Sequence, residues 1–302
     1  MDREIKRILF IYNPFSGKAL IKNYLYDILQ ELIQLDAEIV IHPTREAMEA
    51  YGYIKDHASE YDMIVCSGGD GTLNETVSGI MKCGGDKPVL GYIPSGSTND
   101  FAASIGISKN MRTAAHEIVT GKSIKIDVGR FNDRYFTYVA AIGAFTNVSY
   151  ATPQNMKNML GHQAYIIEAM KQLTVIKPMS IIVETEKGRV EGEFIYGMIT
   201  NSKSVGGVKG ISGKNVDMRD NEFEITFIRK PLNPMHFNNI VSALLLQDYK
   251  GDTVYFDHVN KVKVYAKDQQ IPWVIDGEFG GNLREVNIVV EHEALEIMVP
   301  DN

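Results

Sequence analysis

The chain has 302 residues, of which 44% are hydrophobic and 23% charged, and its formal net charge is −7 at pH 7. This composition is typical of a globular protein with one large or two medium domains. The negative charge argues against a general affinity for nucleic acid, but it leaves membrane contact through a local patch open.

No segment predicts secretion or a membrane span. The first apolar run, Ile8 to Tyr12, is too short for the core of a signal peptide, and no run approaches the ~20 apolar residues of a spanning helix. The two cysteines, Cys66 and Cys83, lack metal-ligand spacing. A reducing cytoplasm is therefore the expected compartment.

Strand-like and helical segments alternate over the first 120 residues. This alternation predicts a parallel sheet with helices on both faces. Ligands bind at the carboxyl ends of such strands, so the turns at 13–18, 68–72 and 94–100 should lie on one rim. The expected strands are 8–12, 38–42, 63–67 and 89–93, and the expected helices are about 21–32, 46–58, 73–81, 101–103 and 111–120.

The pattern changes near residue 124. Asn132-Asp133 and Lys187-Gly188 are hairpin signals between strand-like runs. The second half therefore predicts an antiparallel sandwich, with a hinge near Gly129 and a cleft between the halves. Further strands are expected at 223–229, 259–266, 271–275, 285–291 and 294–299, and helices at about 158–175 and 234–247.

Five consecutive residues, Gly68 to Thr72, follow the third strand and precede a helical pattern. Glycines let backbone N–H groups approach phosphate oxygens, and a helix N-terminus adds positive dipole. The carboxylate of Asp70 would repel bare phosphate, which favours Mg²⁺, a hydroxyl or an ammonium group as its neighbour. Because the pattern GxxxxGK[ST] is absent, the glycine turns would hold the phosphates.

Several motifs resemble the diacylglycerol kinase catalytic-domain superfamily, which includes bacterial lipid kinases, sphingosine kinases and ceramide kinases. They are NPFSGK at 13–18, GGDGT at 68–72, PSGSTNDF at 94–101, IDVG at 126–129 and IDGEF at 275–279. Their order and spacing are similar to those of bacterial members of this length.

The resemblance implies a three-layer α/β nucleotide-binding domain, related to NAD kinase and phosphofructokinase, followed by an antiparallel β-sandwich domain. The strand pattern leads to the same division. Residues 1–128 would form the first domain and 129–292 the lipid-substrate domain, with the tail at about 293–302 packing back on the first.

The resemblance also implies nucleotide contacts, to which Lys18 is added as a cation able to neutralise phosphate charge. Ser97 stands where the family usually has threonine, and the hydroxyl is kept. Helix capping is the alternative role for Ser16, Thr44 and Ser97, and a solvated side chain is the alternative for Lys18. The whole set is Asn13, Pro14, Ser16, Gly17, Lys18, Thr44, Gly68, Gly69, Asp70, Gly71, Thr72 and Ser97.

Acidic residues would carry the catalysis. Asp70 would bind or orient Mg²⁺ near the transferring phosphate. Asp100 and Asp127 match family acidic positions near the same cleft, with a helix cap and a strand-end turn as their alternative roles. Glu278 matches the family's proposed general base, which receives the hydroxyl proton. Asp276 and Asp70 compete for that role.

Bacterial relatives carry a second, structural Mg²⁺ site, whose counterpart here is residues 216–224. Asp220 would supply the carboxylate, and backbone oxygens near Asp217 and Glu222 would assist. Asn221 replaces the usual glycine, and asparagine tolerates positive φ better than most residues. A charged surface loop is the alternative.

Two segments are candidates for lipid contact. Residues 156–170 are rich in flexible apolar side chains, and 206–211 form a glycine-rich loop. Ordinary core packing is the alternative for the methionines, so no single residue is assigned to the lipid.

These inferences predict a cytoplasmic kinase that acts at the inner face of the membrane, with ATP and Mg²⁺, on a lipid hydroxyl. Diacylglycerol is the leading acceptor, and phosphatidylglycerol, a sphingoid base and an undecaprenol-like lipid are others. A soluble-substrate kinase of the NAD-kinase type is one alternative, disfavoured by the first and last motifs. A non-catalytic nucleotide-binding regulator is another, disfavoured by the intact Asp70 and Glu278. A homodimer is left open.

Overall fold

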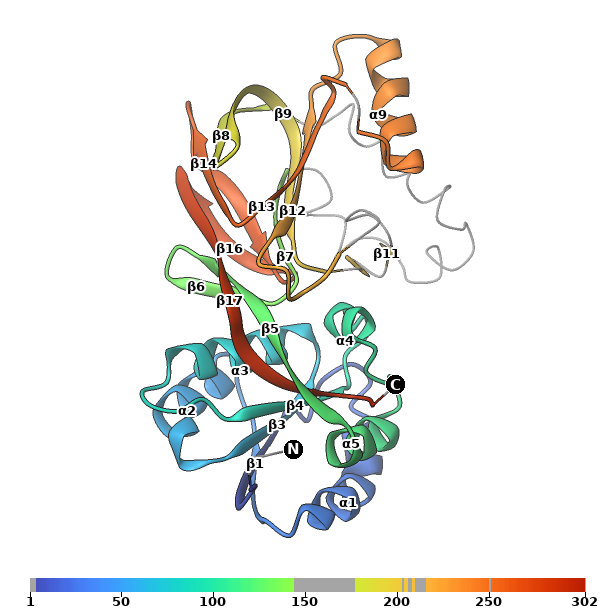
Figure 1. The fold of residues 1–302 in the computed structure, drawn as a ribbon, viewed down its shortest axis with the longest axis vertical. Helices are drawn as coiled ribbons and strands as arrows, with labels where there is room; N and C mark the ends of the chain where they lie inside the picture. Colours follow the sequence, from blue (N-terminus) through green and yellow to red (C-terminus); the bar gives the residue numbers. More distant parts are fainter. Residues whose placement is uncertain are drawn as a thin grey trace.

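The computed structural model describes residues 4–143, 177–202, 204–205, 208–209, 216–249 and 251–301. It has two parts, one above the other in Figure 1, joined by two long strands that run between them. The lower part contains both ends of the described chain. The expected helix at 158–175 and the candidate lipid segments at 156–170 and 206–211 lie outside the described residues or largely so.

The lower part is built on a parallel sheet. Its strands have the order β2-β1-β3-β4, and every neighbouring pair is parallel. All residues of β3 and β4 are buried, as expected for central strands covered on both faces. The bounds are β1 Arg7–Tyr12, β2 Glu38–Pro43, β3 Met63–Gly68 and β4 Val89–Pro94.

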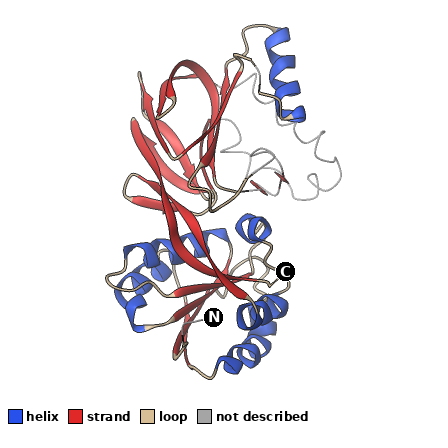
Figure 2. Ribbon diagram, viewed as in Figure 1, coloured by secondary structure: helices blue, strands red, loops and turns tan. Residues whose placement is uncertain are grey.

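Helices cover both faces of this sheet, which makes the three layers visible in Figure 2. Helices α1 and α5 pack against each other on one side, and α2 and α3 on the other. The bounds are α1 Ile21–Leu32, α2 Glu49–His57, α3 Asp70–Lys82, α4 Asp100–Ile105 and α5 Met111–Thr120, with short 3₁₀ turns at Ile33–Leu35 and Ala58–Glu60.

The order of the strands creates a crevice at the carboxyl end of the sheet. The chain goes outward from β1 to β2 and then returns across β1 to β3. The helices that follow β1 and β3 therefore lie on opposite faces of the sheet. In doubly wound sheets this switch point is where ligands bind.

Two long antiparallel strands join the two parts. They are β5, Lys122–Phe131, and β17, Glu285–Val299. The first half of β17 also pairs with β14 of the upper part, and Ile297 pairs with Leu90 of β4 in the lower part. The two strands predicted at 285–291 and 294–299 are thus one strand, with a bulge between Glu291 and Leu295.

Gly129, the expected hinge, lies inside β5 rather than in a loop. A Cβ atom at this position would lie 2.2 Å from the ring of Phe136. The glycine therefore serves the close packing of β5 against β6, Arg134–Phe136. The expected boundary at 128/129 falls within a continuous, paired strand.

The upper part is antiparallel and has its own apolar core, which includes Phe136, Phe194, Phe223 and Trp273. The predicted hairpin at Asn132-Asp133 is present. The hairpin predicted at Lys187-Gly188 turns one residue earlier, at residues 186–187, because Thr185 pairs with Gly188. Its elements are β6, β7 Val139–Gly143, β8 Met179–Thr185, β9 Gly188–Thr200, β10 Ser204–Val205, β11 Val208–Lys209, β12 Phe223–Arg229, α9 Pro234–Leu246, β13 Val254–Val259, β14 Lys261–Ala266, β15 Ile271–Ile275 and β16 Glu278–Leu283.

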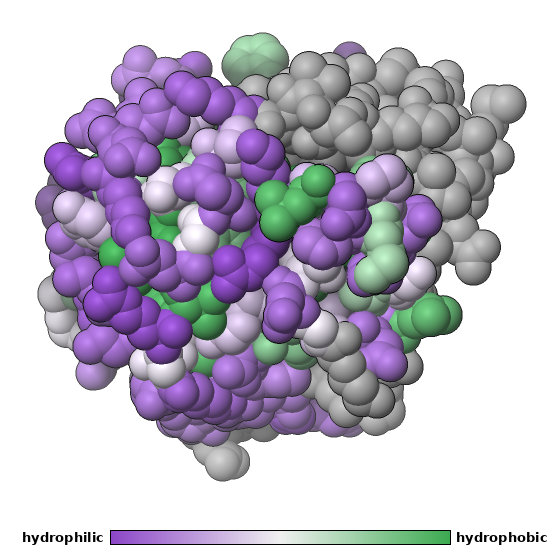
Figure 3. All heavy atoms as spheres, turned by 90° about the horizontal axis from the view of Figure 1, so that it is seen from above, coloured by the Kyte–Doolittle hydropathy of each residue, from purple (hydrophilic) through white to green (hydrophobic). Residues whose placement is uncertain are grey.

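Figure 3 views the molecule from above, at the end formed by the upper part. Hydrophilic residues cover most of the described surface there, and hydrophobic residues are seen deeper, between them. This is the distribution expected where antiparallel sheets pack face to face and keep apolar side chains between them. Among the described helices, none is long and apolar enough to cross a bilayer.

The predicted fold class is confirmed: a parallel α/β sheet is followed by antiparallel strands. Sequence reasoning missed β13 and β16, and it placed the start of β14 two residues early. The helix predicted at 234–247 agrees with α9 to within one residue.

Candidate functional site

Three turns meet at the carboxyl end of the parallel sheet, as the strand order requires. The N–H of Asn13 donates to the carbonyl of Ser67 at 2.9 Å, and the N–H of Ser95 donates to that of Gly68 at 2.8 Å. A Cβ at Gly96 would lie 2.6 Å from Cα of Gly69. The backbones of the second and third turns are therefore in direct contact, which only glycine permits.

The first turn is equally close. Gly17 has a φ of +58°, and a Cβ there would lie 2.3 Å from the carbonyl oxygen of Ser95. The side chain of Asn13 accepts a hydrogen bond from the N–H of Phe15 at 2.9 Å, and its amide nitrogen lies 3.4 Å from the hydroxyl of Thr72. Asn13 thereby shapes its own turn and ties it to the start of α3.

The start of α3 points into this region. Gly69 is extended and stands immediately before the helix, which begins at Asp70. The first N–H groups of a helix have no partner within it, and they carry the positive end of the dipole. The glycines that precede them leave room for an anion to approach.

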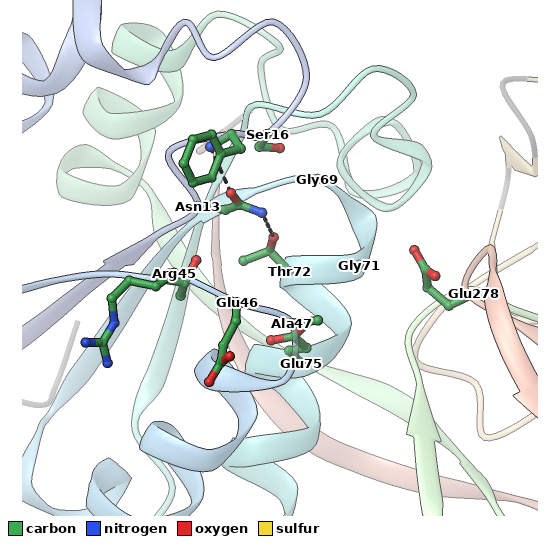
Figure 4. Close-up of a pocket in the computed structure, with 12 residues that line it drawn as sticks. Asn13, Ser16, Arg45, Glu46, Ala47, Gly69, Gly71, Thr72, Glu75 and Glu278 are labelled. Atoms are coloured by element: carbon green, nitrogen blue, oxygen red, sulfur yellow. Dashed lines mark hydrogen bonds between the residues drawn. The ribbon is translucent and has the colours of Figure 1, made fainter.

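A pocket with a cavity volume of about 400 Å³ lies beside these turns. Figure 4 shows Asn13, Ser16 and Thr72 on one side of it and Glu278 on the other. Glu278 comes from the upper part of the molecule, so both parts contribute to the pocket. The lining is Asn13, Phe15, Ser16, Thr44, Arg45, Glu46, Ala47, Gly69, Gly71, Thr72, Glu75 and Glu278.

Six of the predicted nucleotide residues line this pocket: Asn13, Ser16, Thr44, Gly69, Gly71 and Thr72. The others belong to the same turns but are not among the lining residues. Gly17 allows the close approach to the backbone of Ser95 described above, and Gly68 leaves room for the side chain of Thr72, whereas Lys18 and Ser97 are exposed.

Sequence reasoning missed Arg45, Glu46, Ala47 and Glu75. Arg45 forms an ion pair with Glu49 at 3.0 Å, and this hydrogen-bonded guanidinium lowers the pKa of Glu49 to about 2. Burial raises the pKa of Glu75, against the effect of backbone N–H groups at the start of α2. Its spacing offered a signal, because Glu75 follows Gly71 by four residues and shares its helix face.

Asp70 is a largely buried carboxylate with other carboxylates nearby. Burial, with Asp100 and Asp276 nearby, raises its pKa from 3.8 to about 6. Its Oδ2 accepts a hydrogen bond from the N–H of Asn99 at 3.1 Å, whereas its buried Oδ1 has no partner among the described residues. A buried carboxylate oxygen without a donor fits a cation.

Asp276 occupies a two-residue hairpin turn with Gly277. Both residues have positive φ, +47° and +85°, which is the geometry of a type I′ turn and the reason for the Asp-Gly pair. The carboxylate accepts five hydrogen bonds: from the N–H and hydroxyl of Thr137, the N–H groups of Tyr138 and Val139, and the amide of Asn74. Its lone pairs are occupied, so Asp276 is poorly placed to act as a base.

Glu278 follows this turn and is exposed. A Cβ on Gly71 would lie 3.4 Å from Oε1 of Glu278. The carboxylate therefore lies directly against the glycine-rich turn. Of the three candidates for the general base, Glu278 is the exposed one, and its Oε1 lies beside Gly71 of the glycine-rich turn.

Asp100 and Asp127 lie in different surroundings. Asp100 is 2% exposed, and its charge contributes to the raised pKa of Asp70. Asp127 is 1% exposed and accepts hydrogen bonds from the N–H groups of Asn221 and Glu293 and from the ring of His292, at 2.7–2.8 Å. These contacts join Asp127 to the β17 bulge and the 216–222 segment, and its catalytic role stays a prediction.

The candidate metal segment forms a turn beside Asp127. Asn221 adopts a φ of +63°, so the replacement of glycine keeps the predicted turn. The N–H of Glu222 donates to Asp220, and burial together with Asp217 and other carboxylates raises the pKa of Asp220. Within the described ranges, no three His, Cys, Asp or Glu side chains gather as a metal-binding group.

Comparisons with known proteins identify relatives of this chain. The family model of the diacylglycerol kinase catalytic domain matches residues 7–131. A diacylglycerol kinase from Bacillus subtilis is 32% identical over 97% of this chain and 99% of its own length. One from Staphylococcus carnosus is 30% identical, over 98% of this chain and 95% of its own.

Solved structures show the same fold. A diacylglycerol kinase from Bacillus anthracis superposes with a TM-score of 0.77 at 20% identity, over 99% of this chain and 98% of its own. An NAD kinase from Archaeoglobus fulgidus, solved in complex with ATP, superposes with a TM-score of 0.54 at 14% identity, over 97% of this chain and 94% of its own.

Proposed function

The chain belongs to the diacylglycerol kinase family, and on that premise we propose that it transfers the γ-phosphoryl group of ATP to the hydroxyl of diacylglycerol. The observation that carries the proposal is the placement of Asp70 and Glu278. They come from different parts of the molecule: Asp70 belongs to the glycine-rich turn and begins α3, and Oε1 of Glu278 lies beside Gly71 of the same turn.

The nucleotide would bind in the pocket beside the three turns. The free N–H groups at the start of α3 would face phosphate oxygens, and Asn13, Ser16 and Thr72 would supply hydrogen bonds. The closely packed turns around Gly17, Gly69 and Gly96 leave the backbone accessible to the phosphates.

Asp70 would hold Mg²⁺, because its buried Oδ1 lacks a donor among the described residues. When bound, the ion supplies positive charge that neutralises the transferring phosphate. Asp100 would add to the negative potential beneath it. The segment with Asp217, Asp220 and Glu222 stays a candidate for a second Mg²⁺, since Asn221 keeps the predicted turn.

Glu278 would accept the proton of the lipid hydroxyl. The alcohol oxygen then forms a bond to the γ-phosphorus as the bond to the bridging oxygen of ADP breaks, giving phosphatidic acid and ADP. Residues 1–128 would provide the nucleotide side and 129–292 the lipid side, while residues after 293 return to the first part along β5. The substrate resides in a bilayer, so the protein would act at the membrane surface from the cytoplasm.

Transfer of label from γ-labelled ATP tests this function. The protein is incubated with Mg²⁺ and mixed micelles of diacylglycerol, phosphatidylglycerol or a sphingoid base, and in parallel with NAD. Label should enter phosphatidic acid. Label in NAD without any in lipid would favour the NAD-kinase alternative, and tight ATP binding without transfer would favour the regulator.

The base is tested by Glu278→Gln, which keeps the shape but removes the charge. We expect kcat to fall by about 10²–10⁴-fold, the range typical of general bases. The matched control is Asp268→Asn, an exposed carboxylate in the turn before β15, which should keep wild-type turnover. Near-normal turnover of Glu278→Gln would contradict the assignment.

A further inference from the structure

The side chain of Glu278 is not held by contacts of its own. It is exposed, and the described part of the chain gives it no hydrogen bond or ion pair. Its position is therefore set by the backbone of the Asp276-Gly277 turn that precedes it. Whatever holds that turn also decides where the carboxylate of Glu278 lies relative to the glycine-rich turn.

The turn is held from two sides. Thr137, Tyr138 and Val139 donate to the carboxylate of Asp276 from within the upper part. Asn74 donates to it from α3, with Nδ2 2.8 Å from Oδ2 of Asp276. Because Asp276 is only 2% exposed, these bonds are shielded from competing water.

Asn74 is itself fixed in orientation. Its amide nitrogen also donates to the carbonyl of Tyr135 in β6 at 3.0 Å, so both amide hydrogens have acceptors in the upper part. Asn74 follows Asp70 by four residues and lies on the same face of α3. One helix face thus carries the residue on the phosphate side and the contact to the turn on the acceptor side.

We propose that Asn74 is a positioning residue for phosphoryl transfer: through Asp276 it fixes Glu278 at a set distance from the N-terminal turn of α3. The inference rests on the proposed function, in which Glu278 is the base. Asp276 is then an anchor rather than a base. Alignment of this kind is worth a large factor in rate, because a displacement of ~1 Å at a reacting group costs about 10²-fold.

A double-mutant cycle tests the proposal. Asn74→Ala should lower kcat for diacylglycerol by about 10–100-fold and leave the KM for ATP within about twofold. In the Glu278→Gln background the same change should lower the residual kcat by less than about twofold, because residues that act as a unit are not additive. An equal loss in both backgrounds would mean that Asn74 does not act through Glu278.

The control variant is Ser78→Ala, one turn further along the same face of α3 and half-buried like Asn74. It should leave kcat and both KM values unchanged. Asn74→Ser, which keeps a shorter donor, provides a second test of the same bond and should lower kcat less than Asn74→Ala. Loss of activity in Ser78→Ala would show a general sensitivity of α3 and overturn the specific role.

Hydrogen exchange separates this inference from the proposed function. The amides of Tyr138 and Val139, which donate to Asp276, should exchange about tenfold faster in Asn74→Ala than in the wild type. Their exchange rate should be unchanged in Ser78→Ala. If wild-type protein transfers no phosphate to diacylglycerol but this acceleration is seen, the proposed substrate is wrong and the anchor stands. Unchanged exchange together with unchanged kcat would overturn the anchor.

Discussion

At the scale of single residues, the surroundings of Asp70 in the folded protein disfavour the ionised form of its carboxylate. Asp70 is surrounded by acidic neighbours, and burial is the main cause of its raised pKa. A cation would relieve that cost. In the proposed site, Asp70 would therefore lower the stability of the protein when no cation is bound, which is common at functional sites.

Asp70→Asn should stabilise the fold and abolish transfer. A rise in pKa from 3.8 to about 6 corresponds to about 3 kcal/mol. Between those pH values the folded state keeps a proton that the unfolded state releases, so this group lowers stability as pH rises through the window. Urea unfolding without Mg²⁺ at pH 7.5 should show the variant more stable by about 1–3 kcal/mol.

The stability gained by Asp70→Asn should disappear near pH 4, where Asp70 is protonated in the folded protein. At pH 7.5, Mg²⁺ with ATP should reduce the difference in stability between the variant and the wild type, because they would stabilise the wild type alone. A variant less stable than wild type at pH 7.5 without Mg²⁺ would contradict this account of Asp70.

The glycine contacts between turns provide a second prediction. Gly96→Ala would place a Cβ 2.6 Å from Cα of Gly69, so the third turn must move away from the second. We expect the KM for ATP to rise by about tenfold, since the phosphate-facing backbone loses its alignment. Titration with ATP under initial-rate conditions measures it.

Gly52→Ala is the matched control. Gly52 lies inside α2, and a Cβ there would meet nothing within 4 Å. It should leave the KM for ATP unchanged and stabilise the protein by about 0.5–1 kcal/mol through helix propensity. If both alanine variants showed the same KM, contact between the turns would not matter for the nucleotide.

At the scale of elements, the bulge in β17 explains the position of Asp127. The strand continues across the bulge because Asp127 accepts from His292 and Glu293 where the ladder is interrupted. The same carboxylate also accepts from Asn221. One buried side chain therefore fixes β5, the bulge and the candidate metal segment together.

Asp127→Asn should destabilise the protein by about 2–3 kcal/mol. The amide nitrogen of asparagine cannot accept these hydrogen bonds, and a buried donor without an acceptor is costly. Urea unfolding measures the change, and amide exchange should accelerate at Asn221 and Glu293. Asp133→Asn, an exposed carboxylate in the β5–β6 turn, should change stability by less than about 0.5 kcal/mol.

At the scale of the whole molecule, the two parts share more than a linker. The strands β5 and β17 pass through both parts. One apolar core includes Ile64 and Leu90 of the parallel sheet together with Met198 and Ile228 of the antiparallel part. A pocket between the parts is therefore held by continuous strands and a shared core.

This continuity predicts one cooperative unfolding transition. Calorimetry should give a single peak whose calorimetric and van't Hoff enthalpies agree, and ATP with Mg²⁺ should shift the whole peak upward. Two peaks, of which only one shifts with nucleotide, would show that the parts unfold separately. The matched control is UTP or buffer at equal ionic strength, which reports non-specific effects of the added anion.

The sequence by itself determined the features that are encoded by residues close together in the chain. Alternating strands and helices predicted the parallel sheet, the glycine turns predicted a phosphate-facing rim, and Asp-Gly before Glu278 predicted a tight turn. The order of these motifs also identified the family. Each signal lies within a few neighbouring residues, where backbone sterics and local hydrogen bonds act.

Only the tertiary structure decided which acids share an environment. Asp276 looked like a second base in sequence, but its oxygens accept hydrogen bonds from Thr137, between β6 and β7, from Val139 in β7, and from Asn74, which is 202 residues away. The contacts of Asp127 with the β17 bulge also came only from the structure. Such hydrogen bonds join side chains to backbone far along the chain, so they leave no local pattern to read, and folding must first bring the strands together.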